Sequence, residues 1–453
     1  MLMIVSASIL MIGVDLSGIY VAVLAIKKEL GLSGPAMVWV VNAYLIPYGS
    51  FLLLGGRLGD AYGHHRVFLL GIGLFTVASL CCGLSGAAEW LIGGRVVQGF
   101  GAAAAYSVAQ TLALEGVEGQ PERAKALGSL GVAGAVGGIL GLVLCGALTD
   151  ALSWRWIFLL NVPIGIVVLA TAIAVLPRHT RNLVSPPPQV INAIVLTLTS
   201  MLTIYGAQTR LEHSAVSPYT LGCSVALLLM FIALELRARS PLLPVNLLLD
   251  GLFMTATLIG SLWLGSQLVC SYILTLFFQN VLHWTPMTVG LAFMPITLIG
   301  AVSSFKLSPF LTSRYGIKLP CAASLVATLI GIATFATMTS HVFLMKDILP
   351  GLVLIGLGTG VASNAIMLSA LKNVPRENYG AAAGLLNGAA NIAAAVTMAY
   401  VSSITVSNVS RPFKINSVDL SVLTNSYHGD FILASSLMAV ALIVCGVFLH
   451  PDS

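Results

Sequence analysis

Asp15 is a carboxylic acid near the middle of the first long apolar stretch of the chain, which runs from Met1 to Ile26. A charged side chain at the centre of a bilayer costs at least ~2.5 kcal/mol on insertion scales. Such a residue persists mainly where it carries a proton or a cation, or where it pairs with a buried base. Desolvation favours the protonated carboxyl, whereas a nearby arginine or a bound cation favours the carboxylate. A proton and a cationic ligand can therefore compete for this one side chain.

A polar stripe in a later apolar stretch offers a partner for Asp15. The stripe consists of Arg95, Gln98, Ala102, Tyr106 and Gln110. Spacings of three or four residues place these side chains on one face of a helix. Two interpretations are open: Asp15 and Arg95 form an exchange site for protons and cations, or they form a structural ion pair. Arg95 could also extend to the outer interface, because it lies about one turn inside the predicted span.

The elements that position these residues must cross a bilayer. Hydrophobic residues make up 58% of the 453 residues and charged residues only 8%, against about 25% charged in a soluble domain. Fourteen apolar segments approach the roughly 20 residues that a spanning helix needs. Their approximate limits are 3–26, 37–56, 67–87, 91–114, 127–148, 156–176, 190–208, 219–236, 252–280, 288–309, 319–340, 348–371, 379–405 and 430–450. The predicted fold class is an all-α polytopic membrane protein with 14 transmembrane helices.

Basic and aromatic residues predict the orientation of these spans. With a cytoplasmic N-terminus, the inner loops carry more Lys and Arg than the outer loops, as the positive-inside rule requires. Five of the six tryptophans then fall at outer span ends, as in an interfacial aromatic belt. We therefore expect a multi-pass protein of the cytoplasmic membrane with both termini in the cytoplasm. The net charge of +5 reflects the inner loops and predicts no nucleic-acid partner.

Two pairs of loops recur at nearly one spacing. Residues 58–65 match residues 311–318 at an offset of 253, and residues 121–123 match residues 375–377 at an offset of 254. Duplication of a six-helix unit explains both offsets. We expect a six-helix bundle in residues 1–176, linkers and two inserted helices in 177–251, and a second six-helix bundle in 252–453.

The loop after the second span carries the first family resemblance. The string Gly56-Arg57-Leu58-Gly59-Asp60-Ala61-Tyr62-Gly63-His64-His65-Arg66 resembles the cytoplasmic signature loop of the major facilitator superfamily. The resemblance implies a role in conformational gating for Gly56, Asp60, Gly63 and Arg66. This chain has His64 and His65 where the family usually has Arg or Lys.

Two further motifs resemble that superfamily. Arg95-Val96-Val97-Gln98-Gly99-Phe100-Gly101 is similar to its span-4 motif, which implies a part in proton transfer for Arg95. Residues 137–146 resemble the antiporter motif of span 5 and keep Gly137, Gly141 and Gly146. Leu142 and Cys145 replace the family's proline and one glycine.

The strings Ser153-Trp154-Arg155-Trp156-Ile157-Phe158-Leu159-Leu160-Asn161-Val162-Pro163-Ile164-Gly165 and Phe278-Gln279-Asn280 resemble the fourteen-helix drug:proton antiporters in particular. That resemblance implies proton-coupled efflux of lipophilic, often cationic, drugs, with Asp15 and Arg95 as the coupling site. The altered span-5 motif keeps a second hypothesis open, a facilitator or proton-coupled transporter of a specific small metabolite. No nucleophile–base motif, nucleotide loop or metal-ligand spacing occurs in the sequence, so we expect no enzyme, no cofactor and no metal. The expected partners are protons, a small-molecule substrate and the lipid bilayer, and we expect a monomer.

Polar and aromatic residues within the spans are candidates for the substrate cavity. These candidates are Tyr20, Trp39, Tyr44, Gln98, Tyr106, Gln110, Gln267, Ser271 and Asn364. For Gln267 and Asn364, hydrogen bonding between helices is an equally open interpretation. Among the sixteen acids, only Asp15 is expected to lie deep in a span.

Overall fold

The computed structural model describes residues 1–114, 120–176, 190–211, 217–238, 245–338, 343–375, 379–409 and 420–449. Within these ranges every regular element is a helix and no strand occurs, as the sequence predicts. Eleven helices are long and apolar enough to cross a membrane, or up to twelve if the bent helix α2 (Gly34–Tyr62) is one span. The described residues thus do not reach the predicted count of fourteen. Helix α4 (Ala88–Leu114), which carries the polar stripe, is not among the eleven, and the apolar part of α8 (Val190–Leu211) is only Val190–Gly206.

Contacts divide the chain into two compact units. The first is Met1–Thr203 with Tyr219–Leu243, and the second is Ile204–Pro218 with Pro244–Ser453. The predicted partition into residues 1–176, 177–251 and 252–453 stays a prediction. The predicted linker from Pro177 to Gln189 lies outside the described residues, as do residues 239–244 of the linker that follows the inserted helices.

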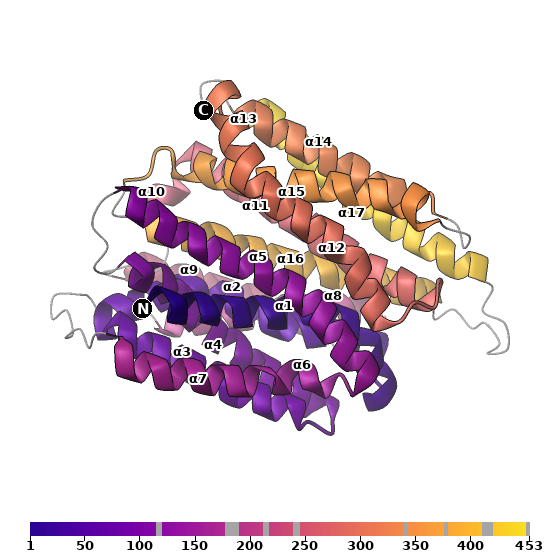
Figure 1. Cartoon of the computed structure of the whole chain (residues 1–453), viewed down its shortest axis with the longest axis horizontal. Helices are drawn as coiled ribbons and strands as arrows, with labels where there is room; N and C mark the ends of the chain where they lie inside the picture. The colour runs from indigo at the N-terminus through magenta and orange to yellow at the C-terminus, as the bar shows by residue number, and fades with distance from the viewer. Residues whose placement is uncertain are drawn as a thin grey trace. The chain divides into compact units, whose positions relative to one another are not determined.

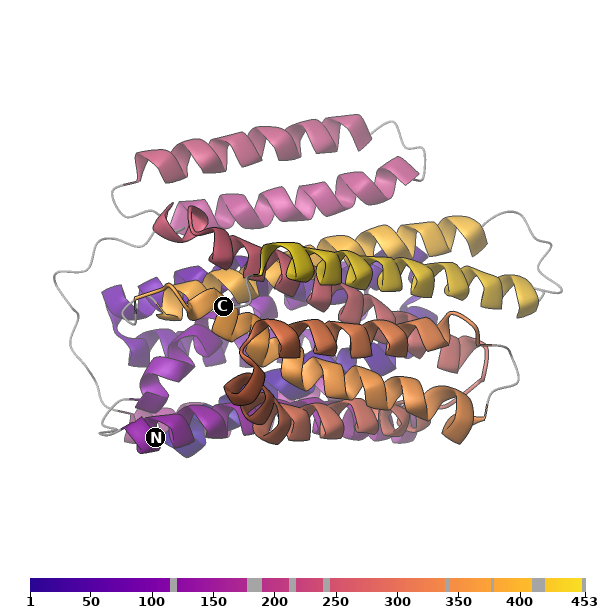
Figure 2. The ribbon, with the colours of Figure 1, turned by 90° about the horizontal axis from the view of Figure 1, so that it is seen from above.

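The first unit is built on three packing pairs that position α1 and α4. Its helices are α1 (Leu2–Leu30), α2, α3 (His64–Gly83), α4, α5 (Gln120–Ala151), α6 (Arg155–Leu159), α7 (Asn161–Val175), and most of α8 and α9 (Ser217–Arg237). Helix α5 lies along α1, and α4 packs against both α2 and α3 (Figure 1). Helices α8 and α9 run side by side (Figure 2), and Asn192 on α8 donates a hydrogen bond to Glu235 on α9 at 2.6 Å.

In the second unit, as in the first, a central helix packs against two neighbours. Its helices are α10 (Val245–Leu248), α11 (Gly251–Asn280), α12 (Pro286–Val302), the π-helix η1 (Ser303–Leu307), α13 (Ser308–Tyr315), α14 (Lys318–Phe335), the π-helix η2 (Leu344–Ile348), α15 (Leu349–Leu371), α16 (Tyr379–Val409) and α17 (Leu420–Phe448). Helix α11 packs against α16 and α17, and α15 packs against α12 and α14. Helix α17 begins ten residues before the predicted limit of 430, because its first turns are polar and hydropathy alone does not indicate them.

The two repeated loops share one backbone conformation. Gly63 follows the end of α2 with a φ of 97°, and Gly316 follows the end of α13 with a φ of 73°. Positive φ is the region that glycine adopts without a steric penalty. The residues at the predicted offset of 253 therefore make the same kind of turn, each directly before or within two residues of the next helix.

The span-5 motif forms a close seam between α5 and α1. A Cβ atom added to Gly137 would lie 2.5 Å from the carbonyl oxygen of Leu10, and one added to Gly141 would lie 2.5 Å from that of Val14. Only glycine fits at such separations, so these residues permit the close approach of the two helices. Cys145, which stands where the family has glycine, packs opposite Gly18 of α1, where a side chain would collide with its Sγ.

A break between α6 and α7 has a local cause. Pro163 has no backbone N–H and cannot donate to the carbonyl of Leu159, four residues earlier. Helix α6 ends at Leu159, and α7 begins at Asn161. Leu160 keeps helical φ and ψ values of −59° and −35°, so the interruption is confined to the hydrogen-bond ladder, and Asn161 is the first residue of α7 with its side chain fully buried.

Candidate functional site

Asp15 and Arg95 meet in the interior of the first unit. Both side chains are 0% exposed, and Arg95 Nη1 donates to Asp15 Oδ2 at 2.5 Å. Asp15 comes from α1 and Arg95 from α4. The alternative in which Arg95 extends to the outer interface is therefore wrong, because the guanidinium turns inward to the carboxylate.

Two amides complete the shell around the carboxylate. Gln98 Nε2 donates to Asp15 Oδ1 at 2.9 Å, and Asn161 Nδ2 donates to the same oxygen at 3.1 Å. Gln98 also accepts from Arg95 Nη1 through Oε1 at 2.9 Å. Gln98 thus links the acid to the base, and the carboxylate is bonded to groups from two helices other than its own.

Other helices hold Arg95 independently of Asp15. Arg95 Nε donates to the carbonyl oxygen of Val40 at 3.2 Å. The guanidinium carbon lies 4.3 Å from the ring centroid of Tyr44 on α2 and 5.7 Å from that of Phe158 on α6. Aromatic faces attract a cation, and the attraction is strongest away from water. Loss of charge on Asp15 would therefore leave Arg95 with several partners in place.

The centre also contains polar atoms that have no hydrogen-bond partner within the described residues. They are the hydroxyls of Tyr20 and Tyr44, Arg95 Nη2 and Asn161 Oδ1. An unmatched buried polar atom costs about 1–3 kcal/mol, so these four atoms lower the stability of the centre in this conformation.

Part of the centre was not predicted from the sequence. Asn161 lies within the string of residues 153–165 that resembles the drug:proton antiporters, and that resemblance was its only signal. Ser79 and Cys82 on α3 hold Gln98: Ser79 Oγ accepts from Nε2 at 2.7 Å, and Cys82 Sγ donates to Oε1 at 3.7 Å. Small polar residues in an apolar helix gave no pattern by which these two could be found.

The predicted cavity residues of the first unit have different environments. Tyr20 and Tyr44 are buried, Trp39 and Tyr106 are half-buried, and Gln110 is exposed. Tyr44 stacks on Tyr48 with a centroid separation of 5.6 Å, and Tyr48 meets Tyr106 edge-on at 6.1 Å. These rings form a continuous aromatic row that starts at Arg95.

Two of the three predicted cavity residues of the second unit, Gln267 and Asn364, make bonds between helices. Gln267 on α11 donates to Thr359 on α15. Asn364 on α15 donates to the backbone carbonyl of Ser304 at 2.9 Å and to its hydroxyl at 3.0 Å, within η1. Ser271 is half-buried, and its backbone carbonyl accepts from Thr275 at 2.9 Å.

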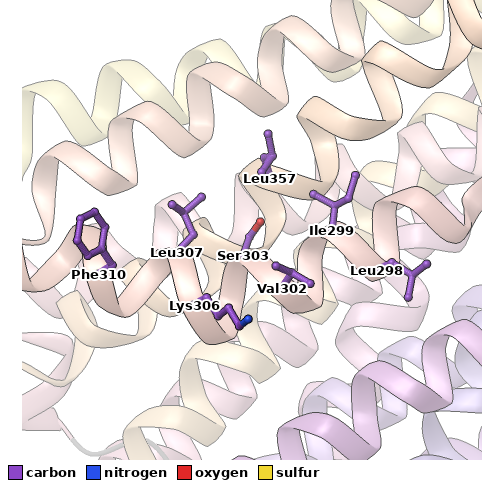
Figure 3. Close-up of a pocket in the computed structure, with 8 residues that line it drawn as sticks. All are labelled: Leu298, Ile299, Val302, Ser303, Lys306, Leu307, Phe310 and Leu357. Atoms are coloured by element: carbon purple, nitrogen blue, oxygen red, sulfur yellow. The ribbon is translucent and has the colours of Figure 1, made fainter.

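A groove of about 480 Å³ lies on the second unit, where α12, η1 and α13 meet α15 (Figure 3). Its lining is Leu298, Ile299, Val302, Ser303, Lys306, Leu307, Phe310 and Leu357. None of the predicted cavity residues contributes to it. The lining is apolar apart from Ser303 and Lys306.

Asp15 is not the only buried acid of the chain. Asp430 on α17 is 3% exposed and Glu235 on α9 is 9% exposed. The expectation that Asp15 is the one deep acid is therefore wrong when depth is judged by burial within the protein. The sequence did not indicate that Asp430 is buried, because α17 begins before the apolar segment and Asp430 lies well inside the helix. Glu235 is covered by the packing of α8 on α9, which sequence periodicity does not reveal.

The prediction of a loop for the signature segment, residues 56–66, is wrong: the segment is the end of α2 and the start of α3, because α2 runs to Tyr62 and α3 begins at His64. Asp60 and Arg66 are exposed, whereas Gly63 is buried and Gly56 is half-buried. Asp60 Oδ1 lies 3.3 Å from His64 Nε2, one helical turn later in the chain. One of the two histidines that replace the family's basic residues therefore supplies a partner for Asp60.

A bundle of membrane-spanning helices with a buried acid–base centre defines a class, the helical membrane carriers. Comparison with known proteins identifies the family within that class. Residues 4–398 match the model of the Major Facilitator Superfamily, and the chain belongs to that family.

Individual relatives cover most of the chain. It is 33% identical to the cephamycin export protein of Amycolatopsis lactamdurans over 95% of this chain and 88% of that protein. It is 30% identical to the puromycin resistance protein of Streptomyces alboniger over 89% of this chain and 81% of that protein. The solved structure of a nucleoside transporter, 13% identical, covers 99% of this chain and 100% of its own with a TM-score of 0.65. That structural likeness supports the fold.

Proposed function

We propose that this protein is a proton-coupled efflux transporter of lipophilic, often cationic, toxic compounds in the cytoplasmic membrane, and that it acts as a carrier without enzymatic activity. The buried Asp15–Arg95 pair, bonded at 2.5 Å with both side chains fully enclosed, carries the proposal. The names of the relatives support the direction of transport, because they describe export of cephamycin and resistance to puromycin.

The geometry suggests how exchange works. With Asp15 ionised, the carboxylate is bonded to Arg95, Gln98 and Asn161. A proton that reaches the carboxylate removes its charge and weakens all three bonds, since hydrogen bonds to charged groups are about twice as strong as neutral ones. Arg95 remains held by the carbonyl of Val40 and the face of Tyr44. The proton and a cationic substrate would then bind to Asp15 in alternation, each displacing the other.

The topology we propose is the one that the sequence predicts. It has fourteen spans with both termini in the cytoplasm, in two six-helix bundles of residues 1–176 and 252–453 that flank the inserted segment 177–251. A monomer is sufficient for this scheme, because every residue of the Asp15 centre belongs to one unit of one chain.

Replacement of the proposed coupling residue tests the function. Cells that produce the Asp15→Asn variant should no longer export ethidium, a lipophilic cation, while the protein still reaches the membrane in normal amounts. The matched control is Asp430→Asn, which replaces a buried aspartate of the other unit by the same isostere and should retain export. Export by Asp15→Asn that still follows the pH gradient at the wild-type rate would refute the coupling role.

A further inference from the structure

Asn161 bonds to Asp15 and also has a buried acceptor oxygen without a hydrogen-bond partner. Its side chain is 0% exposed, and its Nδ2 donates to Asp15 Oδ1 at 3.1 Å. Its Oδ1 is buried and has no partner. A side-chain amide offers two donors and an acceptor with two lone pairs, so the acceptor oxygen of Asn161 is unused while its Nδ2 donates to the ionised Asp15.

The two forms of Asp15 require different neighbours. A carboxylate only accepts hydrogen bonds, whereas a protonated carboxyl also carries one O–H donor. In a buried site that donor needs an acceptor, because an unmatched buried donor loses its bond to water and gains nothing in return. A coupling centre must therefore supply an acceptor that becomes available when the proton arrives.

The other residue that donates to Asp15 Oδ1 has no comparable free acceptor. Gln98 Oε1 accepts from Arg95 at 2.9 Å and from Cys82 at 3.7 Å. The unpartnered hydroxyls of Tyr20 and Tyr44 have no hydrogen bond to the carboxylate. Among the residues that the structure describes, Asn161 alone combines an existing bond to Asp15 with an unpartnered acceptor oxygen.

We propose that Asn161 serves both protonation states of Asp15. It donates from Nδ2 to the carboxylate, and after a half-turn of its amide it accepts the O–H of the protonated acid through Oδ1. Asn161 is in this sense a positioning residue: it holds the carboxyl in one place while the proton binds and leaves. The inference rests on the proposed function, since a carboxyl that never changes protonation would not need the second role.

Several charged or titratable groups surround Asp15 and share its environment. They are Arg95 on α4, Tyr44 on α2, Cys82 on α3, Cys145 on α5, and Tyr20 on α1 itself. On α6, Arg155 pairs with Glu29, which lies fourteen residues along α1 from Asp15, or about 21 Å at 1.5 Å per residue. Asn161 is an uncharged residue bonded to Asp15, so Asn161→Leu and Asn161→Ser change the hydrogen bonding of Asp15 without adding or removing a charge.

Infrared spectroscopy of the purified protein tests the inference without requiring transport. The C=O stretching band of protonated Asp15 is the carboxylic-acid band that is missing from Asp15→Asn, and it can be titrated with pH. Asn161→Leu, which has similar volume and no hydrogen-bonding group, should change the frequency of this band. Asn161→Ser, whose hydroxyl donates and accepts and leaves room for a bridging water, should move it back toward the wild-type position.

Asn161→Asp separates the two roles, because it keeps the acceptor and loses the donor. Two neighbouring carboxyls favour a shared proton, so the band should persist to a pH at least one unit higher, a tenfold lower proton concentration. Asn192→Leu is the matched control: Asn192 is a buried asparagine that donates to the carboxylate of Glu235 at 2.6 Å, away from the centre. It should leave the Asp15 band and its titration unchanged.

Transport by the same variants connects the inference to the function. In proteoliposomes with an imposed pH gradient, Asn161→Leu should lower ethidium transport at least tenfold, Asn161→Ser should recover part of it, and Asn192→Leu should stay near wild type. An Asp15 band that neither shifts nor titrates differently in Asn161→Leu and Asn161→Asp would overturn the inference. A wild-type protein that moves no ethidium but responds in the infrared as expected would overturn the proposed function and leave the role of Asn161 intact.

Discussion

Removal of Arg95 should destabilise the protein more than removal of the acid and the base together. Asp15 and Arg95 are both fully buried and bonded at 2.5 Å. Breaking a buried ion pair by removing one partner typically costs about 3–5 kcal/mol, because the remaining charge is uncompensated. Arg95→Met leaves the carboxylate with only the amide donors of Gln98 and Asn161, so we expect a cost within that range.

The opposite single change should cost less. In Asp15→Asn the guanidinium keeps the carbonyl of Val40, the amide oxygen of Gln98 and the face of Tyr44. A hydrogen bond to a charged group contributes about 1.5–3 kcal/mol, and we expect a loss of about 2 kcal/mol. The double variant Asp15→Asn/Arg95→Met contains neither charge, so it should be about 2 kcal/mol more stable than Arg95→Met alone.

Reversible unfolding by dodecyl sulfate in mixed micelles, followed by circular dichroism, measures the three free energies. Since an unpaired buried carboxyl can take up a proton instead of keeping its charge, the penalty of Arg95→Met should also decrease as the pH falls. Strict additivity of the two single changes, with no dependence on pH, would refute the view that the pair forms a charged unit.

Two further predictions concern helix packing. Gly141→Leu should disrupt the seam between α1 and α5, because even a Cβ atom would lie 2.5 Å from a backbone carbonyl of α1. Gly138→Leu is the control, since a Cβ atom there meets open space and the change should be tolerated. The yield of folded monomer in detergent distinguishes the two variants, and equal yields would contradict the seam. Asn364→Leu leaves the backbone carbonyl of Ser304 in η1 without its side-chain donor, so it should lower the free energy of unfolding by about 1–3 kcal/mol. Unfolding by dodecyl sulfate measures this loss. An unchanged free energy of unfolding would mean that water replaces the amide.

The sequence predicted the ion pair because its signals are local and strong. An acid within an apolar stretch and an arginine on a polar stripe are each rare enough to stand out, and both were expected to interact. The turn at Gly63 and its copy at Gly316 were likewise indicated by short strings at one offset. These are features in which a few consecutive residues determine the outcome.

Other features depend on long-range packing and were not predicted. Burial of Asp430 depends on where α17 begins, and its first turns are too polar for hydropathy to detect. Hydrogen bonding between helices was one of two open interpretations for Gln267 and Asn364, but their partners lie 92 and 60 positions away, and no pattern along one helix specifies those partners. The roles of Ser79 and Cys82 follow from the rotation of α3 against α4, which periodicity leaves undetermined.

Three of the motifs that resemble the family meet at one carboxylate, and the structure gives each of the three a physical reason. Glycines of the span-5 motif allow α5 to approach α1 at Val14, directly beside Asp15. The span-4 motif supplies Arg95 and Gln98 from α4. In the string of residues 153–165, Pro163 interrupts the hydrogen-bond ladder between α6 and α7, and Asn161 at the start of α7 donates to Asp15. Motifs that are far apart in the sequence therefore contribute to one site, so a substitution in any of them should change the pH at which Asp15 takes up a proton. The altered residue Cys145 keeps the seam closed because α1 has Gly18 opposite it, and the loss of the family's glycine at that position is compatible with an intact centre.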